Sequence, residues 1–422
     1  MRQLKLRSGI LLAAGAFAVA ASVSGTPDAA AKDEPAGLVA RYLETVEIAP
    51  AMEHRLVVVH PILAKTVPPV RGQEVRLGGT TSPDLLAFGE MPPASKSHTE
   101  AASFAEEPIV LLAGDVLRTE TADLAVLRDT VVLKDKPIQV PLFRVSRDTV
   151  TDPAAVEPRM LGQVMPSALR YLLLQGGRAP DIRDASDRFA ADMKLSTPRR
   201  SPAEYGLAES IATRVADYRK SLATLPQPAA GAEREVVGCA VFLDGALASI
   251  ETFATGKLFT AVWPKLLEGI AAEAAVQELR EDLLAEELAA PADPDRFLAE
   301  ARKRLLAVFA ARTTQSDVRD EGRQLELAVD GAVAHALVFG GDRIAHFVLI
   351  TDPAHRGEER TTESPDLNVA RRKSRPTEEE KRLLERRGNA GDPVPPAPPP
   401  APPTPPAPPS PTPPAPPAPA PK

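Results

Sequence analysis

The sequence predicts an α+β fold with a mainly antiparallel sheet and a few packed helices, and three observations support this prediction. Apolar runs of strand length follow one another closely between residues 56 and 143, with no helical segment between them. Asp-Gly dipeptides at 244–245 and 330–331 each join two apolar runs, which is typical of a β-hairpin turn. Segments with helical periodicity lie further along the chain. We therefore expect antiparallel pairing, not a doubly wound parallel sheet.

Changes in composition along the chain, together with turn and linker residues, divide it into five expected parts. These are a signal peptide at 1–31, an N-terminal linker with the first strand at 32–54, the α+β domain at 55–352, a basic linker with a short helix at 353–392, and a disordered proline-rich tail at 393–422.

The first half of the α+β domain is expected to be rich in strands. Residues 152–202 are less regular, apart from a helical piece at 169–174. Residues 205–222 have helical spacing, because their apolar residues recur on one face. The predicted strands of this half lie at 56–59 with a continuation over 61–63, and at 109–112, 131–133 and 140–143.

The second half combines hairpins with two helices. The helices are expected at 257–290 and 294–311, and Pro264 must lie in the first turn of the former or kink it. The predicted strands lie at 236–242, 247–253, 325–329, 333–339 and 344–350, with a further turn at Gly340-Gly341.

Residues 1–31 have the layout of a cleavable secretory signal. Three basic residues precede an apolar run over 10–21, and small residues follow up to Ala31, the expected last residue removed, with Ser24 as an alternative. The run is shorter than the roughly 20 residues that cross a bilayer. We therefore expect export to the periplasm or the cell exterior, with no transmembrane segment after cleavage.

The last residues are dominated by proline. Between Pro393 and Pro421, 19 of 29 residues are proline, which predicts a solvated polyproline II segment. Such a segment is a spacer through an envelope layer, a ligand for a proline-binding groove, or an inert tail. Before it, Thr377 to Arg387 is predicted to form a short helix in a basic neck, which either contacts an anionic polymer or lipid surface or is a solvated linker.

Composition excludes several classes of function. Cys239 is the single cysteine, so no internal disulfide can form. One Trp and four Tyr argue against an aromatic carbohydrate-binding platform. The net charge of −7 becomes more negative when residues 1–31 are removed, which argues against nucleic-acid binding.

Common catalytic motifs are absent from the sequence. It contains no Gly-x-Ser-x-Gly elbow, no His-Glu-x-x-His helix and no Gly-x-Gly-x-x-Gly loop. Gly256-Lys257 lacks both the following hydroxyl residue and the leading glycine of a phosphate-binding loop. Cys239 lies inside an apolar strand, where an inert buried thiol is expected. We therefore predict no cofactor and assign no catalytic residue.

His335 and His346 are the one pair for which the sequence predicts a geometry. If Gly340-Gly341 forms a two-residue turn, the two imidazoles face each other across the hairpin. They could then share a transition metal, with Asp352 or His355 completing the ligand set. Cross-strand histidines also occur as plain polar partners, so a metal site here is only a speculative alternative to our prediction of no metal.

Two further sets of polar residues can be interpreted either as ordinary structural residues or as parts of a functional site. His54 and His60 flank one predicted strand, and their even spacing places them on one face. An acidic cluster surrounds two predicted strands, where it either forms a solvated face or supplies paired carboxylates for acid–base work. Its members are Asp115, Glu120, Asp123 and Asp129.

Three stretches of the chain resemble one bacterial family. A strand–turn–strand over 238–253 leads to Trp263-Pro264-Lys265-Leu266-Leu267, 108–115 is an apolar strand that ends in a Gly-acidic turn, and 322–341 is a closing hairpin. Together they resemble the ARG and rhodanese-phosphatase-superfamily-associated protein domain, over about 55–350. That family tends to carry a Lys-Gln-Asn group where this chain has Glu120-Thr121-Ala122-Asp123. Its molecular function is unassigned, and its name implies genomic association with enzymes that act on ADP-ribose or phosphoesters.

Two hypotheses for the function follow. The first is an exported, non-catalytic binding or scaffold protein of the bacterial cell envelope, with an unidentified protein or envelope polymer as its partner. The second is a hydrolase-like or metal-assisted enzyme on a small phosphorylated or ADP-ribose-related molecule. A polar pocket formed by Asp115, Glu251 and Lys265 would favour the enzyme, and a flat face with these residues scattered would favour the binding protein.

Overall fold

The computed structural model describes ten stretches of the chain. The predicted signal peptide, the short helix in the basic neck, the proline-rich tail and the predicted end of the helix 257–290 lie outside them. The described residues are 35–65, 76–78, 85–89, 98–146, 158–177, 179–225, 234–280, 294–318, 322–340 and 343–356.

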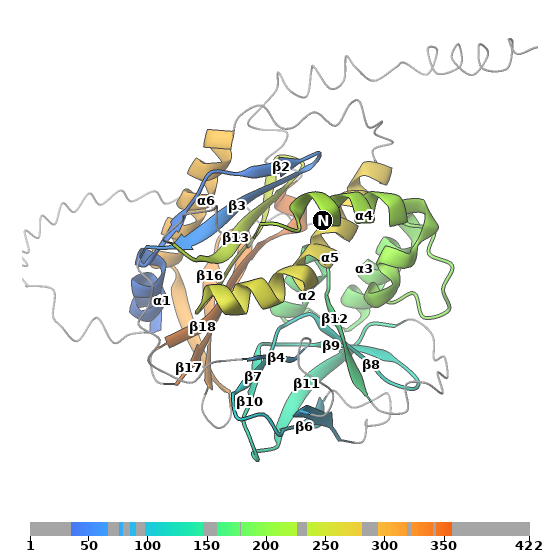
Figure 1. Ribbon diagram of the computed structural model, residues 1–422, viewed down its shortest axis with the longest axis horizontal. Helices are drawn as coiled ribbons and strands as arrows, with labels where there is room; N and C mark the ends of the chain where they lie inside the picture. The colour runs from blue at the N-terminus through green and yellow to red at the C-terminus, as the bar shows by residue number, and fades with distance from the viewer. Residues whose placement is uncertain are drawn as a thin grey trace, which may run out of the picture. The chain divides into compact units, whose positions relative to one another are not determined.

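The centre of the described part is a nine-stranded sheet in which every pairing is antiparallel (Figure 1). Its strand order is β1-β3-β13-β14-β18-β17-β16-β15, and β2 also pairs with β3. The strands are β1 Val46–Ile48, β2 Met52–His54, β3 Val57–Ala64, β13 Val236–Leu243, β14 Ala246–Phe253, β15 Arg312–Val318, β16 Gly322–Val329, β17 Ala332–Phe339 and β18 Arg343–Thr351.

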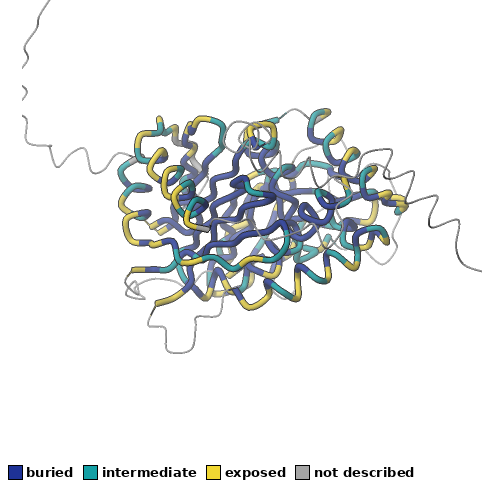
Figure 2. Tube along the Cα trace, turned by 90° about the horizontal axis from the view of Figure 1, so that it is seen from above, coloured by how far each residue is buried: buried dark blue, intermediate teal, exposed yellow. Residues whose placement is uncertain are grey.

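Helices cover both faces of this sheet, and the strands are accordingly apolar on both faces. Along β13, Val237 and Phe242 belong to the core under α1 and α6, whereas Cys239 and Val241 belong to the core under α5. Figure 2 shows buried strands at the centre and exposed positions along the helices around them. The helices are α1 Pro35–Glu44 and α6 Pro294–Phe309 on one face, and α2 Ser167–Leu174, α3 Ala179–Asp192, α4 Glu209–Leu222 and α5 Gly256–Arg280, with the 3-10 helix η5 Pro202–Leu207, on the other.

Two smaller sheets are inserted in the chain between β3 and α2 and enclose an apolar core of their own. The three-stranded sheet, in the order β10-β7-β4, consists of β4 Arg76–Leu77, β7 Ile109–Leu111 and β10 Thr130–Val132. The six-stranded sheet, in the order β12-β8-β9-β11-β6-β5, consists of β5 Leu86–Phe88, β6 His98–Ser103, β8 Asp115–Arg118, β9 Asp123–Val126, β11 Ile138–Arg144 and β12 Arg159–Val164.

The predicted α+β class with mainly antiparallel sheet is confirmed. Of all the described strand pairs, only β4–β7 is parallel. The predicted hairpin at Asp244-Gly245 forms β13 and β14, and both turn residues have the positive φ (48° and 83°) that a type I′ turn requires. Pro264 lies well inside α5, not in its first turn.

The structure also contains elements that the sequence patterns did not predict. Helix α1 lies in the segment expected to be a linker with the first strand, and α3 and β12 lie in the region expected to be irregular. Helix α3 buries Ile182, Phe189 and Ala190 among largely polar neighbours, so its apolar stripe is sparse. No helix among the described residues is long and apolar enough to span a membrane.

Candidate functional site

Charged side chains from the large sheet and from the segments of the two small sheets meet on the α5 face of the large sheet. Glu251, in the middle of β14, receives two hydrogen bonds from the guanidinium of Arg170 on α2, with Nη1–Oε1 at 2.6 Å and Nη2–Oε2 at 3.1 Å. Both residues are buried, Glu251 at 3% and Arg170 at 2% exposure. This is the bidentate geometry that makes an arginine–carboxylate pair strong.

His346 on β18 lies between two carboxylates. Its Nδ1 is 2.6 Å from Oδ2 of Asp129, its Nε2 is 3.3 Å from Oε2 of Glu251, and its ring stacks on Phe253 with the centroids 4.5 Å apart. Burial opposes the charged imidazolium, but the carboxylates of Asp129 and Glu251 outweigh it and raise the pKa of His346 to about 9. The imidazole is therefore protonated at neutral pH, and each ring nitrogen donates to a carboxylate.

The same contacts hold the carboxylates in their ionised forms. Burial by itself would raise the pKa of Glu251, but Arg170 and His346 lower it to about 2. For Asp129 the effect of burial is likewise outweighed, chiefly by the charge of His346, and the pKa lies below its usual value.

The turn that leads into β8 is clamped by this cluster. The backbone N–H of Ala113 donates to Asp129 Oδ1 at 2.8 Å, and its carbonyl accepts from Nε of Arg170 at 3.0 Å. Gly114 has φ of 89°, and a Cβ there would lie 2.7 Å from Cγ of Arg170. Asp115 forms an ion pair with Lys265 of α5 and accepts from the Leu112 N–H at 2.9 Å.

The cluster balances its charges within the interior. Three cations face three anions, and neither of the two pockets described for the molecule is lined by any of the six residues. These residues, each at most 3% exposed, are Asp115, Asp129, Arg170, Glu251, Lys265 and His346. We call them the central ion cluster. It joins the large sheet, α2, α5 and the small sheets.

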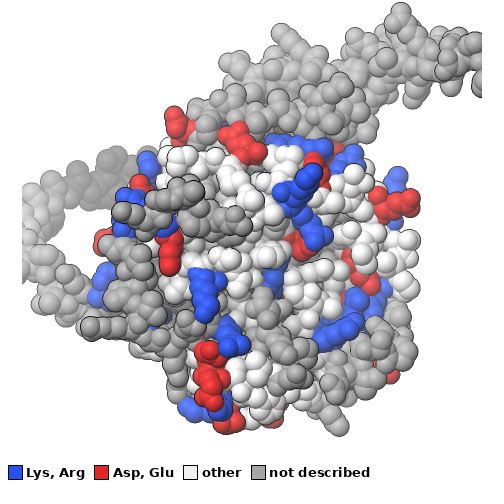
Figure 3. Space-filling view, in the orientation of Figure 1, with Lys and Arg blue, Asp and Glu red and all other residues white. Residues whose placement is uncertain are grey.

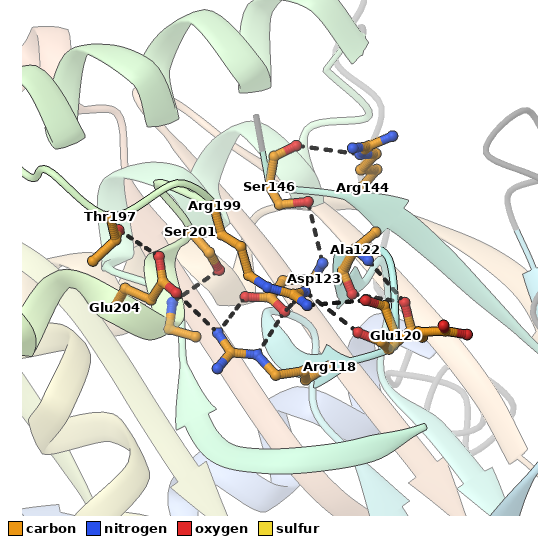
Figure 4. A network of polar contacts seen from close by, with 12 residues as sticks. Arg118, Glu120, Ala122, Asp123, Arg144, Ser146, Thr197, Arg199, Ser201 and Glu204 are labelled. Carbon is orange, nitrogen blue, oxygen red and sulfur yellow. Dashed lines mark hydrogen bonds and ion pairs between the residues drawn. The ribbon is translucent and has the colours of Figure 1, made fainter. Parts of the chain in front are cut away.

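A second polar network lies at the turn between β8 and β9 (Figure 4). Asp123 receives two hydrogen bonds from Arg118, at 2.9 and 2.8 Å, and a third from Arg199 at 3.0 Å. Arg199 also donates to the backbone carbonyl of Glu120 at 3.1 Å, and Arg118 approaches Glu204 at 3.4 Å. The network ties the β8–β9 turn to the segment before α4.

The acidic cluster predicted from the sequence is therefore distributed over separate partners. Asp115, Asp123 and Asp129 are buried, at 0–1% exposure, whereas Glu120 is exposed. Each buried aspartate is neutralised by a different cation, so the three do not lie on a solvated face.

The predicted direct pairing of His335 with His346 is wrong. His335 lies opposite Val348 and His346 lies opposite Leu337, because the register shifts between Leu337 and Val338. The two imidazoles share a face but are offset by two residues. Nδ1 of His335 accepts a hydrogen bond from the side-chain amide of Gln324 at 2.8 Å, and burial lowers the pKa of His335.

The two other residues named for this metal site lie in other contacts. Asp352 accepts a hydrogen bond from the Tyr171 hydroxyl at 3.1 Å and lies 3.4 Å from Nδ1 of His355. Among the described residues, no three His, Cys, Asp or Glu side chains are arranged to hold a metal ion.

His54 and His60 do not lie on one face of one strand. A turn at Arg55 and Leu56 places His54 on β2 and His60 on β3. His54 contacts Asp217 of α4 at 2.9 Å, whereas His60 contacts the Ala49 carbonyl at 2.9 Å and lies edge-on to Phe242. The chain reversal, which the even spacing concealed, separates their surroundings.

Cys239 fits the expectation of an inert buried thiol. Cys239 pairs across the strands with Glu251, and burial raises the pKa of its thiol well above the usual value, so the thiolate is disfavoured. Lys257 lies in the first turn of α5, after β14.

Sequence reasoning missed Arg170 and a third buried network. Arg356 donates to Glu273 at 2.7 Å and to the Ser167 hydroxyl at 3.0 Å, and the Ser167 hydroxyl also contacts Glu273 at 2.6 Å. A signal was present in the sequence: Arg170 and Glu273 each stand in an apolar helical segment, where a lone charge predicts a buried partner.

The protein is thus an α+β domain in which buried, ionised side chains connect the large sheet with the small sheets and with helices α2 and α5. Residues 184–350 match the sequence model of the ARG and Rhodanese-Phosphatase-superfamily-associated Protein domain, so this stretch of the chain is similar to that family. No significant match was found among curated proteins or among solved structures.

The family match covers only part of the central ion cluster. Glu251, Lys265 and His346 lie within the matched residues, whereas Asp115, Asp129 and Arg170 precede them. Three of its pairs, Arg170–Glu251, Asp115–Lys265 and Asp129–His346, thus join the matched stretch to the chain before it, whereas His346–Glu251 lies within that stretch.

Proposed function

We propose that this protein is an exported, non-catalytic binding or scaffold protein of the bacterial cell envelope. The observation that carries the non-catalytic part is the state of the central ion cluster. Asp115, Glu251 and Lys265 do converge, as an active site would require, but they are 0–3% exposed and paired internally. A substrate could reach them only if these ion pairs opened, so the charges favour a role in holding the domain together.

Export is supported by the sequence alone. A basic start, an apolar run over 10–21 and small residues up to Ala31 fit a cleaved leader. The proline-rich segment after Asp392 fits a spacer that holds the domain away from its attachment or partner. On the face shown in Figure 3, basic and acidic side chains lie interspersed among uncharged ones, which is unlike a nucleic-acid interface.

Localisation can be tested with the full chain carrying a C-terminal epitope in a bacterial host. We expect the protein in the periplasm or the medium, with a mass that lacks residues 1–31. A variant with Leu12→Arg in the apolar run is the matched control, and it should remain unprocessed inside the cell. Recovery of the wild-type chain from the cytosol with Met1 intact would overturn the export proposal.

The tail has its own test. Deletion of residues 388–422 should alter the envelope fraction in which the domain is found, or its capture of a partner. Unchanged localisation and capture would show that the tail is not a tether.

One observation keeps a hydrolase-like function on a phosphorylated or ADP-ribose-related molecule as the second candidate. The polar residues that such an enzyme would need lie together and include a histidine between two carboxylates. Turnover of p-nitrophenyl phosphate and of ADP-ribose derivatives by the purified chain decides between the two. We expect none above background, and turnover that Glu251→Gln abolishes without unfolding the protein would overturn the non-catalytic proposal.

A further inference from the structure

The last described residues of the chain leave the large sheet and return to the interior. Residues 353–356, just after β18, form one helical turn. The carboxylate of Asp352 holds the start of this turn, because its Oδ1 accepts from the Ala354 N–H at 2.9 Å. The Arg356 N–H donates to the Asp352 carbonyl at 3.2 Å and closes the turn. We call residues 352–356 the C-terminal clasp.

Arg356 fixes the end of the clasp to three other elements. Its guanidinium donates to Glu273 of α5 at 2.7 Å and to the Ser167 hydroxyl of α2 at 3.0 Å. It also donates at 3.2 Å to the carbonyl of Ala248 on β14, and to that of Thr351 at the same distance. Glu273 in turn accepts from the N–H and the hydroxyl of Ser167, at 2.7 and 2.6 Å. Arg356, Glu273 and Ser167 are each at most 8% exposed, so these bonds lie in the interior.

The start of the clasp is bonded to the domain as well. Oδ2 of Asp352 accepts from the Tyr171 hydroxyl of α2 at 3.1 Å, and the Asp352 N–H donates at 2.9 Å to the Gly331 carbonyl in the β16–β17 turn. The His355 ring lies beside the same turn, since a Cβ at Gly331 would be 3.3 Å from it. The clasp is therefore bonded to α2 at both of its ends.

The position of the clasp has a mechanical consequence. β18 lies between β14 and β17 inside the large sheet, and it is the last described strand before residues 357–422. If β18 were pulled at a bare end, its ladder bonds would be loaded one pair at a time, beginning where Thr351 pairs with Ala332. The clasp lies between this end and residues 357–422, so its buried bonds are loaded before those of the ladder.

We propose that the C-terminal clasp is a mechanical anchor, which passes a load on residues 357–422 to α2, α5 and β14 before β18 is loaded. Separation of Arg356 from Glu273 leaves two opposite charges without partners in the interior, and this penalty resists the pull. The inference rests on the spacer role proposed for the proline-rich segment, because only a segment that joins the domain to another body carries a load.

An ATP-driven bacterial unfoldase–protease tests the anchor, because it pulls a substrate from the end that carries its degradation tag. The purified chain without the predicted signal peptide receives the tag at its C-terminal end or at its N-terminal end, and both degradation rates are measured. The quantity compared is the ratio of the C-terminal to the N-terminal rate, which a general loss of stability leaves unchanged. Because forced unfolding follows an unfolding rate and the anchor acts at one end only, Arg356→Gln should raise this ratio at least about 5-fold.

A milder variant and a matched control accompany this one. Tyr171→Phe keeps the ring, removes the hydrogen bond to Asp352 and should raise the ratio about 2-fold. Arg302→Gln removes an arginine at an exposed position of α6 and should leave the ratio unchanged. An unchanged ratio for Arg356→Gln, or for Tyr171→Phe if the first variant does not fold, would overturn the anchor, whether both rates rise together or stay constant.

The anchor and the spacer role fail in different measurements. Unchanged localisation and capture after deletion of residues 388–422 would remove the spacer role, whereas the ratio of degradation rates is measured on the chain that retains them. An unchanged ratio would remove the anchor and leave the result of the deletion as it stands.

Discussion

At the residue scale, Glu251 is the carboxylate on which the central ion cluster depends most. It accepts from Arg170 and from His346, and it is buried at the centre of the large sheet. Glu251→Gln removes one of the three negative charges of the cluster and leaves its three cations facing two anions, so one positive charge is in excess in the interior. Since a broken buried pair costs about 3–5 kcal/mol, we expect a loss of that size in the free energy of unfolding, measured with urea.

The control is Glu209→Gln at an exposed position in the first turn of α4. We expect this change to cost about 0.3–1 kcal/mol, the usual value for a charge at an exposed helix end. If Glu251→Gln cost no more than about 1 kcal/mol, as at a solvent-exposed pair, the cluster would not be holding the domain together.

His346 makes a prediction about pH. Its pKa rises from 6.5 to about 9 on folding, so the folded state holds a proton that the unfolded state releases between these values. The stabilisation is complete below pH 6.5 and is lost as the pH rises through 9, by an amount on the order of 3 kcal/mol. Burial lowers the pKa of His60 and of His335, and both therefore reduce stability below pH 6.5. We expect maximal stability near pH 6.5.

The measurement is the free energy of unfolding between pH 5 and pH 9.5, taken with the wild-type chain and with His346→Gln. The quantity compared is the slope of the free energy of unfolding against pH, so a variant that is less stable at every pH remains informative. The decline between pH 6.5 and 9 should disappear in the variant, and an unchanged decline would assign the effect to another group.

At the scale of elements, two glycines test how the turns are held. Gly114 and Gly245 have nearly equal φ, 89° and 83°, but a Cβ at Gly114 would lie 2.7 Å from Arg170, and one at Gly245 would meet nothing within 4 Å. Gly245→Ala should therefore cost only the backbone strain, about 1–2 kcal/mol. Gly114→Ala should cost more, because Arg170 is fixed by Glu251 and cannot give way.

Unfolding in urea compares the two variants, with Gly89→Ala as a control at an unstrained position where a Cβ makes ordinary contacts. Equal losses for Gly114→Ala and Gly245→Ala would mean that Arg170 can move, and the clamp on the turn before β8 would be refuted.

Elements were predictable where the determining residues are neighbours in the chain. The hairpin at Asp244-Gly245 was predicted because its turn residues impose the conformation themselves. The pairing of the strand that holds His335 with the strand that holds His346 was predicted wrongly. The register between these strands shifts after Leu337, and no residue pattern in the sequence indicates this shift. Helix α3 was missed because its stripe of apolar residues is sparse.

The central ion cluster was predictable only in part. Glu251 and Lys265 stand close in the family-like segment, but whether Asp115 converges with them or lies apart was left open by the sequence. Asp129 and His346, in contrast, are 217 residues apart in the chain, and only the packing of the small sheets on the large one joins them. Arg170, as the single charged residue of an apolar helix, predicts that a buried carboxylate partner exists, but the sequence does not indicate which carboxylate it is.

At the scale of the whole molecule, the ion pairs of the cluster cross from the small sheets to the large sheet and to α5. Asp115, on β8, pairs with Lys265 on α5, and Asp129 precedes β10 and pairs with His346 on β18. Opening the small sheets away from the large one therefore exposes charges of both signs without their partners. We expect the described sheets to unfold together, as one cooperative unit.

Hydrogen exchange of the backbone amides tests this expectation. In the wild-type chain the most protected amides of β8, β9 and β11 should have opening free energies equal to those of β13, β14 and β18. Asp115→Asn leaves Lys265 buried and unpaired, so the small sheets should then open first, at a lower free energy than the large sheet. Adding Lys265→Met removes the unpaired charge and should bring the two sets closer together again, whereas Asp217→Asn, in the half-exposed pair with His54, should not separate them. Unequal opening free energies already in the wild-type chain would show that the ion pairs do not couple the sheets, and the central ion cluster would lose its structural role.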